Sequence, residues 1–322
     1  MKALRLTSED GPDALEIAEI DTPSAGAGEV LIDVHAAGVS FVDLLMTRGQ
    51  YQERPDVPFV PGIEVSGVVR EAPAESGLRP GERVAAHVPQ GGYAEVVAAG
   101  TATTFRLPDA LSFRQGTALA VNYQTAHFAL IRRGRLAGGD HVLVHGAAGG
   151  VGTASIQLAK GFGAQVTAVV RSERNAAVAK EAGADDVLVM NDEWVKQARQ
   201  TCPEGYAIVV DPVGGQIFDD SLRLLAPEGR HLVIGFAAGG IPQLKVNRVL
   251  LRNVDVVGVG WGAFLKREPA VVQQAAQDLG RMAGEGVIRP VIGGAYALDE
   301  AATALRDLEG HRTSAKVVID VR

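Results

Sequence analysis

A glycine-rich segment, Gly146 to Gly152 (GAAGGVG), is the part of the sequence with the clearest chemical meaning. It follows an apolar run and opens a helical pattern, and its glycine spacing allows a sharp turn, close approach of a pyrophosphate and close packing of helix on strand. The free N–H groups and the positive dipole at a helix start bind phosphate. We therefore expect a dinucleotide-binding loop; the alternative is a glycine-rich turn that only joins a strand to a helix. The residues expected to contact the phosphates are Ala148, Gly149, Gly150 and Val151.

The next apolar run, which ends at Val170, bears on which dinucleotide is bound. A site for NAD has an acidic residue at the end of this strand, where it accepts hydrogen bonds from the ribose hydroxyls. Here Arg171, Ser172 and Arg174 follow the strand instead. Guanidinium groups suit phosphate, and a serine can cap the following helix. We expect NADP(H) rather than NAD(H), with these three residues at the 2′-phosphate. The alternative is two exposed arginines on a first helical turn, with Glu173 weakening the positive field.

The structural elements that position these residues are predicted by two kinds of sequence pattern. Up to about residue 110, short alternating or β-branched runs are separated by glycine and proline, which predicts antiparallel, partly closed β structure. After a long helical pattern at residues 113–133, apolar strands alternate with helices from His141 onward, which predicts a parallel sheet of βαβ units. The fold class is therefore α/β, with a Rossmann-type parallel sheet domain and a mainly antiparallel β domain. Two further helical patterns, at residues 269–285 and 299–308, and a strand at 316–321 end the chain.

The composition excludes several classes of protein. Of the 322 residues, 47% are apolar and 21% are charged, which excludes disorder, coiled coil and collagen. A single cysteine, Cys202, excludes an intramolecular disulfide and a cysteine-rich zinc site. The net charge of −7 argues against a nucleic acid or an anionic membrane as partner. With no signal sequence and no apolar run near the ~20 residues of a membrane span, we expect a cytoplasmic protein.

Five further motifs lie along the chain, at Gly38–Tyr51, Pro61–Val69, Gly81–Val84, Asn122–Ala126 and Asp211–Gly215. With the glycine-rich segment, they make the whole chain resemble the medium-chain dehydrogenase/reductase superfamily, and most of all its zinc-free NADPH:quinone oxidoreductase branch, the zeta-crystallin-like proteins. The resemblance implies a GroES-like catalytic domain at residues 1–119 and 262–322, and a Rossmann-type NADP(H)-binding domain at residues 120–261. It also implies that the substrate binds in a cleft between the two domains.

The resemblance raises the question of zinc. Alcohol dehydrogenases of the superfamily hold catalytic zinc with a cysteine and a histidine at the positions of Ser40 and Ile63. A hydroxyl and an alkyl group cannot replace thiolate and imidazole. The four clustered cysteines of the structural-zinc lobe are absent, and His127, His141 and His145 lack the spacing of a ligand set. We therefore expect no metal.

The resemblance also implies which residues surround the substrate and the nicotinamide. Ser40 and Tyr51 would position the substrate, although Ser40 could instead cap the helix that begins at Phe41, and Tyr51 could be a packing residue. Asp43 lies in the same region and could hold local structure. We interpret Lys316, which matches a family lysine near the cofactor, as an ordinary lysine at a strand edge. The residues implied near the nicotinamide are Thr125, Val213, Phe236 and Trp261.

The sequence departs from the family at two contacts to the 2′-phosphate. A lysine and a tyrosine of the family are replaced by Asn175 and Met190, which leaves Arg171 and Arg174 to compensate. In addition, no residue stands out as a general acid, so we expect the proton that accompanies the hydride to come from solvent.

These observations predict NADPH-dependent, zinc-independent hydride transfer to a quinone in the interdomain cleft. Without zinc the protein lacks a Lewis acid for alcohol oxidation, which favours small electron-poor acceptors. The alternatives are reduction of an enone, enal or enoyl thioester on the same scaffold and, from another class, a non-catalytic nucleotide-binding or RNA-binding protein. No basic, aromatic-rich patch supports RNA binding. The apolar run Val254–Val259 predicts an edge strand through which two copies would form a homodimer.

Overall fold

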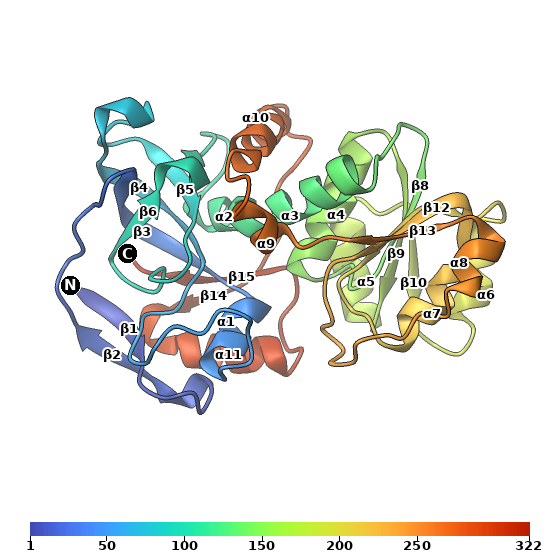
Figure 1. Cartoon of the computed structure of the whole chain (residues 1–322), viewed down its shortest axis with the longest axis horizontal. Helices are drawn as coiled ribbons and strands as arrows, with labels where there is room; N and C mark the ends of the chain where they lie inside the picture. Colours follow the sequence, from blue (N-terminus) through green and yellow to red (C-terminus); the bar gives the residue numbers. More distant parts are fainter. The chain divides into compact units, whose positions relative to one another are not determined.

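The computed structural model describes all residues from Met1 to Arg322. The chain forms two compact units, one of Met1–Val121 with Leu265–Arg322 and one of Asn122–Phe264. The first unit therefore contains both ends of the chain, which are blue and red in Figure 1. The inner unit begins and ends a few residues after the predicted bounds of 120 and 261.

The first unit is built on a mainly antiparallel sheet. Its strands are β3 (Glu29–Val39), β4 (Glu64–Glu71), β5 (Arg83–His87), β6 (Val96–Gly100), β7 (Thr104–Arg106), β14 (Ile292–Ala297) and β15 (Lys316–Asp320). Their order is β14-β15-β3-β4-β5-β7, with β6 also paired to β3, and only β14 and β15 are parallel. A separate antiparallel pair consists of β1 (Lys2–Leu6) and β2 (Leu15–Glu19). The predicted antiparallel β domain is confirmed.

The long strand β3 is central to this sheet because it pairs with β4, β6 and β15. Its apolar side chains are buried together with those of β4 and β5, and the core of the unit lies between them. The pairing of β3 with β4 shifts register between Val34 and Ala36, beside Gly67. A Cβ atom at Gly67 would lie 1.9 Å from the carbonyl oxygen of Asp33, so only glycine fits this close approach.

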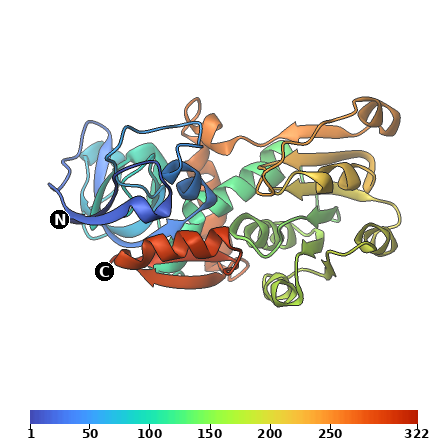
Figure 2. The same ribbon diagram turned by 90° about the horizontal axis from the view of Figure 1, so that it is seen from below.

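Helices complete the first unit. They are α1 (Phe41–Thr47), α2 (Phe113–Ala118), α10 (Val271–Gly284) and α11 (Ala301–Glu309). Figure 2 shows α11 lying along β14 and β15, all three in red, and α11 contacts both strands. Both α1 and α2 begin with a capping box, formed by Ser40 with Asp43 and by Ser112 with Gln115.

The second unit is built on a parallel sheet of six strands in the order β10-β9-β8-β11-β12-β13. The strands are β8 (His141–Val144), β9 (Gln165–Val170), β10 (Asp186–Val189), β11 (Tyr206–Asp211), β12 (Leu225–Val233) and β13 (Asp255–Gly258). The chain runs outward from β8 to β9 and β10, then returns to β11 on the other side of β8. This reversal between β8 and β11 is where open α/β sheets bind ligands, at the carboxyl ends of the strands. The predicted Rossmann-type sheet is confirmed.

Most helices of this unit connect its strands. The helices are α3 (Gln124–His127), α4 (Gly150–Gly161), α5 (Glu173–Glu181), α6 (Trp194–Thr201), α7 (Gln216–Leu222), α8 (Asn247–Arg252) and α9 (Trp261–Leu265), which ends in the first unit. Of these, α3 precedes β8 and α9 follows β13. Helix α4 packs against β8 and β9, and α7 packs against β12. The buried strands carry nearly continuous apolar residues, as expected for a parallel sheet covered on both faces.

The predicted helix at residues 113–133 is not one regular α-helix. One π-helical segment, Leu119–Tyr123, lies between α2 and α3, and a second, Phe128–Arg133, follows α3. Residue periodicity cannot detect such segments, because one extra residue per turn changes the side-chain pattern only locally. Isolated π-helical turns inside α-helices are frequent at functional sites.

Candidate functional site

The glycine-rich segment forms the turn between β8 and α4. Gly146 has a φ of 56°, and the N–H of Gly149 donates to the carbonyl of Gly146 at 2.9 Å, which closes the turn. A Cβ atom at Gly152 would lie 2.2 Å from the same carbonyl oxygen. The geometry of the turn thus favours glycine at positions 146 and 152, and the prediction of a tight strand–turn–helix is confirmed.

The start of α4 fits a phosphate group. Its N-cap residue, Gly149, has no side chain to accept hydrogen bonds from the first turn. The Thr153 hydroxyl donates to the carbonyls of Gly149 and Gly150, so it does not occupy the N–H groups either. The first N–H groups of an α-helix have no partner within the helix and need an outside acceptor. An anion at this point would supply it and interact favourably with the helix dipole.

Two further loops lie at the same edge of the sheet as the phosphate loop. A Cβ atom at Gly146 would lie 3.2 Å from Cγ2 of Val213, in the loop after β11. That loop is joined to the loop after β12, since Ala238 N–H donates to the Val213 carbonyl at 3.0 Å. A Cβ atom at Gly214 would lie 2.9 Å from the ring of Phe236. The structure therefore brings Val213 beside the phosphate loop and Phe236 beside the 212–215 loop.

The end of β9 lies next to the same loop. Ala147 N–H donates to the carbonyl of Val169 at 3.3 Å, which joins the phosphate loop to β9. Arg171, Ser172 and Arg174 follow, and all three are exposed. Ser172 is the N-cap of α5, as predicted. Neither guanidinium makes an ion pair or a hydrogen bond in the structure, so both remain available to an anionic ligand.

The other two residues implied near the nicotinamide are buried. Thr125 is 7% exposed on α3, and Trp261 is 4% exposed at the start of α9, after the edge strand β13. Helix α3 packs against α4. The place of Trp261 near the nicotinamide stays a prediction.

Asn122 is a residue of this region that sequence analysis did not single out. It is 8% exposed, and its Oδ1 atom has no hydrogen-bond partner. A Cβ atom at Gly150 would lie 2.7 Å from that oxygen, so the Asn122 carboxamide packs directly against the first residue of α4. Its place at the head of the Asn122–Ala126 motif was the signal that could have identified it.

In the first unit, Ser40 and Asp43 form one hydrogen-bonded group. The Asp43 Oδ2 atom accepts from the backbone N–H of Ser40 at 2.8 Å and from its hydroxyl at 2.7 Å. The interpretation of Ser40 as a helix cap and of Asp43 as a local structural residue is confirmed. Asp43 is fully buried, and this burial raises the pKa of its carboxyl above the ordinary value.

Lys316 lies close to this group, and its interpretation as an ordinary strand-edge lysine is wrong. The side chain is 3% exposed, and its Nζ atom contacts Oε1 of the fully buried Glu64 at 2.7 Å. It also donates to the Val39 carbonyl at 3.3 Å. The lysine lies on β15, which pairs with β3, and β3 pairs with β4, so the sheet brings together two charges far apart in sequence. Burial raises the pKa of Glu64 to about 7, against the lowering effect of Lys316.

Tyr51 is half-buried and packs on an apolar cluster of Leu6, Met46, Phe59 and Ile63. Burial raises the pKa of its phenol above the ordinary value. The packing alternative is therefore confirmed, and its role toward substrate stays a prediction. Ile63, at the position of a zinc-binding histidine, is 6% exposed within this cluster.

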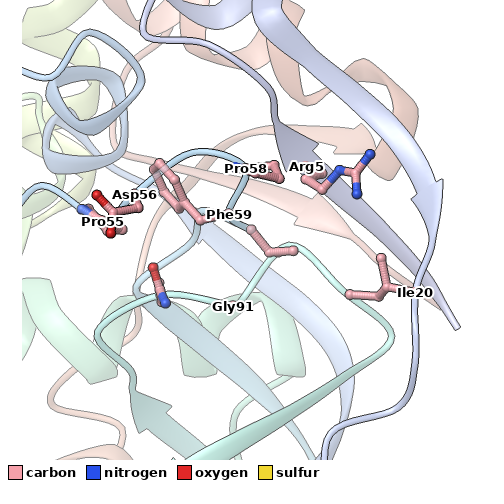
Figure 3. A pocket seen from close by; sticks show the side chains of 9 residues that line it. Arg5, Ile20, Pro55, Asp56, Pro58, Phe59 and Gly91 are labelled. Carbon is pink, nitrogen blue, oxygen red and sulfur yellow. The ribbon is translucent and has the colours of Figure 1, made fainter.

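A shallow hollow of about 600 Å³ also lies on the first unit. Figure 3 shows Phe59 and Asp56 on one side of it and Arg5 and Ile20 on the other. None of the residues predicted to bind cofactor or substrate lines it. The structure contains no group of three or more His, Cys, Asp or Glu side chains that could hold a metal ion, and no helix long and apolar enough to span a membrane.

Comparison with known proteins gives matches over both units. Residues 26–117 match the family described as alcohol dehydrogenase GroES-like domain, and residues 150–278 match the family described as zinc-binding dehydrogenase. Quinone oxidoreductase-like protein 2 of Rattus norvegicus is 35% identical, over 96% of this chain and 89% of that protein. The quinone oxidoreductase of Homo sapiens is 31% identical, over 99% of this chain and 97% of that protein.

Solved structures are similar over their full length. The quinone oxidoreductase of Thermus thermophilus, whose complex with NADPH has also been solved, is 36% identical, with a TM-score of 0.86 and all of both chains covered. A quinone oxidoreductase of Pseudomonas syringae is 29% identical, with a TM-score of 0.90 and 99% of each chain covered.

Proposed function

This chain belongs to the medium-chain dehydrogenase/reductase superfamily of oxidoreductases, and from that membership we propose that it uses NADPH to reduce quinones without zinc. The observation that carries the cofactor assignment is the convergence of the phosphate loop, Val213 and Phe236 at the carboxyl edge of the parallel sheet. Relatives named quinone oxidoreductase, and the NADPH complex of the Thermus protein, support the same assignment.

In this proposal each part of the site has one task. The N–H groups at the start of α4 bind the pyrophosphate, and Arg171 and Arg174 bind the 2′-phosphate. Val213 and Phe236 form the apolar surface against which the nicotinamide packs. When bound, NADPH supplies the hydride, so the protein has to position it and exclude competing acceptors.

Zinc does not fit the residues present. The Ser40 hydroxyl donates to Asp43, and Ile63 offers only an alkyl group buried among apolar side chains. Neither is a ligand that holds zinc in proteins. We therefore assign no step to a metal, although one matching family is described as zinc-binding dehydrogenase.

An acceptor assay tests the reaction. The zinc content of the purified protein is measured first, the protein is then treated with a chelator, and NADPH oxidation is followed with a simple benzoquinone and with an acyclic enone. We expect zinc far below one equivalent and oxidation with the quinone. Activity on the enone alone would favour the alternative reductase, and NADPH binding without turnover on any acceptor would favour a non-catalytic nucleotide-binding protein.

Cofactor preference is tested through the two arginines. An R171A/R174A double variant should lose affinity for NADPH by more than tenfold and keep its affinity for NADH, since charged hydrogen bonds contribute about 1.5–3 kcal/mol. R199A is the matched control, because Arg199 is also exposed and lies on α6, in the same unit. An equal loss for both nucleotides would contradict a role at the 2′-phosphate.

We further propose that two copies join through β13. This strand is the edge of the parallel sheet, as predicted, and pairs only with β12. Next to it, Val246, Leu250 and Leu251, from α8 and the residue before it, are 73–76% exposed. An open edge strand beside exposed apolar residues favours pairing with a second copy. A location in the cytoplasm stays a prediction from composition.

A further inference from the structure

Asp211 is a buried carboxylate at the carboxyl end of β11, directly before the loop that contains Val213. Its Oδ1 atom accepts from the backbone N–H groups of Val213 and Gly214, both at 2.9 Å. Its Oδ2 atom lies 3.0 Å from Nε2 of His231, on β12. Asp211 is 1% exposed and His231 is fully buried. The carboxylate thus has three partners and almost no contact with solvent.

The charge state of this group follows from its surroundings. Burial by itself would raise the pKa of Asp211, but the hydrogen bond with His231, together with the nearby His145 and the Gly214 N–H, holds that pKa below its ordinary value. Asp211 is therefore ionised at neutral pH, and Nε2 of His231 must carry a hydrogen to face it. A buried carboxylate is stable only when its hydrogen bonds are made, so each of these partners constrains the carboxylate.

The geometry of the loop depends on this carboxylate. Gly214 and Gly215 have φ angles of 69° and 64°, and the two inward N–H groups turn the backbone around Oδ1. In this conformation Val213 lies beside Gly146, and Gly214 lies beside Phe236. His231 is one strand away and packs edge-on against Phe218, with ring centroids 4.6 Å apart, which fixes the imidazole.

We propose that Asp211 and His231 are positioning residues for the nicotinamide cofactor: the imidazole orients the carboxylate, and the carboxylate fixes the 212–215 loop against the phosphate loop. This inference rests on the proposed function, since it concerns the same nucleotide site. Neither residue touches the cofactor in this proposal. Both act through the loop, so their loss weakens cofactor binding while the two residues that line the site, Val213 and Phe236, are still present.

A second buried pair in the same unit serves as control. His145 Nε2 lies 2.6 Å from the hydroxyl of Ser221, on α7, and both residues are fully buried. This hydrogen bond is as buried as that of His231, but Ser221 makes no hydrogen bond to the 212–215 loop. S221A therefore removes a comparable interaction without releasing the loop.

The experiment measures the dissociation constant of NADPH, by fluorescence of the reduced nicotinamide, for the wild type, H231L, H231Q and S221A, with thermal unfolding and steady-state kinetics for each. We expect H231L to raise the dissociation constant and the KM for NADPH at least tenfold, with a much smaller change in kcat. H231Q keeps an N–H donor and should stay within threefold of the wild type, and S221A within twofold. A role in folding alone would lower the unfolding temperature of both H231L and S221A and leave the dissociation constant unchanged.

The outcomes separate this inference from the function on which it rests. If the wild type does not bind NADPH, the proposed function fails and the inference fails with it. If the wild type binds and H231L binds equally well, or S221A loses as much affinity as H231L, only the inference is overturned. Should H231L not fold, D211N gives the second measurement, because it keeps an oxygen for the two N–H groups but lacks the charge. A threefold or greater loss of affinity in D211N supports the inference, and an unchanged affinity overturns it.

Discussion

The buried contact between Glu64 and Lys316 leads to a stability prediction with a definite sign. In the wild type the Lys316 Nζ atom lies 2.7 Å from Oε1 of Glu64. Substitution of Glu64 by glutamine keeps an oxygen that can accept from Nζ and removes the group that ionises. Burial raises the pKa of Glu64 from 4.5 to about 7. Between these two values the folded protein binds more protons at this site than the unfolded chain. The wild type therefore loses stability as the pH rises through this range, and E64Q does not.

The magnitude follows from the same pKa values. Each unit of pKa difference corresponds to about 1.4 kcal/mol, so the full contribution is about 3 kcal/mol, and about 2 to 3 kcal/mol of it develops between pH 5 and pH 8. The difference in unfolding free energy between E64Q and the wild type should grow by that amount over this interval, in favour of E64Q. Other groups that titrate in this range occur in both proteins, and their contributions largely cancel in the difference.

Urea unfolding at several pH values measures this difference. Both tryptophans, Trp194 and Trp261, lie in the second unit, so unfolding of the first unit must be followed by circular dichroism rather than by tryptophan fluorescence. E16Q, a substitution at an exposed residue of β2, is the control and should give a profile parallel to the wild type. If the E64Q profile is also parallel to the wild type, Glu64 does not take up a proton on folding and the reasoning is refuted.

Three other substitutions or conditions have defined expected outcomes. G152A should abolish NADPH binding in a titration, because its Cβ would lie 2.2 Å from the Gly146 carbonyl oxygen, and binding like the wild type would contradict the tight turn. An L250E/L251E variant should sediment as a monomer with unchanged circular dichroism, whereas a dimer would show that these leucines do not form the interface. Burial lowers the pKa of His145 to about 4, so below pH 6.5 the unfolded chain binds a proton that the folded protein does not. The unfolding free energy should therefore fall by about 3 kcal/mol as the pH falls from 6.5 toward 4. In H145N this loss is absent, so its acid unfolding, monitored by Trp194 fluorescence, should be shallower.

Local sequence signals predicted the elements and their caps well. The parallel sheet followed from alternating apolar runs and helices, and the phosphate loop followed from glycines three residues apart. Ser40 with Asp43 and Ser172 with Asn175 are pairs three residues apart, within reach of each other in any helix start. Such contacts depend on backbone conformation over a few residues, which the sequence specifies directly.

Contacts between distant residues were not predictable in the same way. Lys316 resembles an exposed strand lysine until the pairing of β15 with β3, and of β3 with β4, places it beside Glu64. The partnership of Asp211 with His231 depends on the register of β11 and β12, in which Val209 lies opposite His231. Periodicity predicts that two strands are buried, but not which residues of the two strands lie side by side.

The same distinction separates the two halves of the candidate site. The phosphate contacts come from backbone N–H groups of one continuous turn, so glycine spacing was sufficient to locate them. The apolar contacts come from Val213 and Phe236, whose loops meet only because β8, β11 and β12 are neighbours in the sheet. If the Asp211 carboxylate fixes that meeting point, cofactor affinity is controlled by a buried hydrogen bond between Asp211 and His231 that no local motif contains. The loss of NADPH affinity in H231L, compared with that in S221A, measures how far NADPH binding depends on contacts between strands of the sheet rather than on the glycine-rich turn.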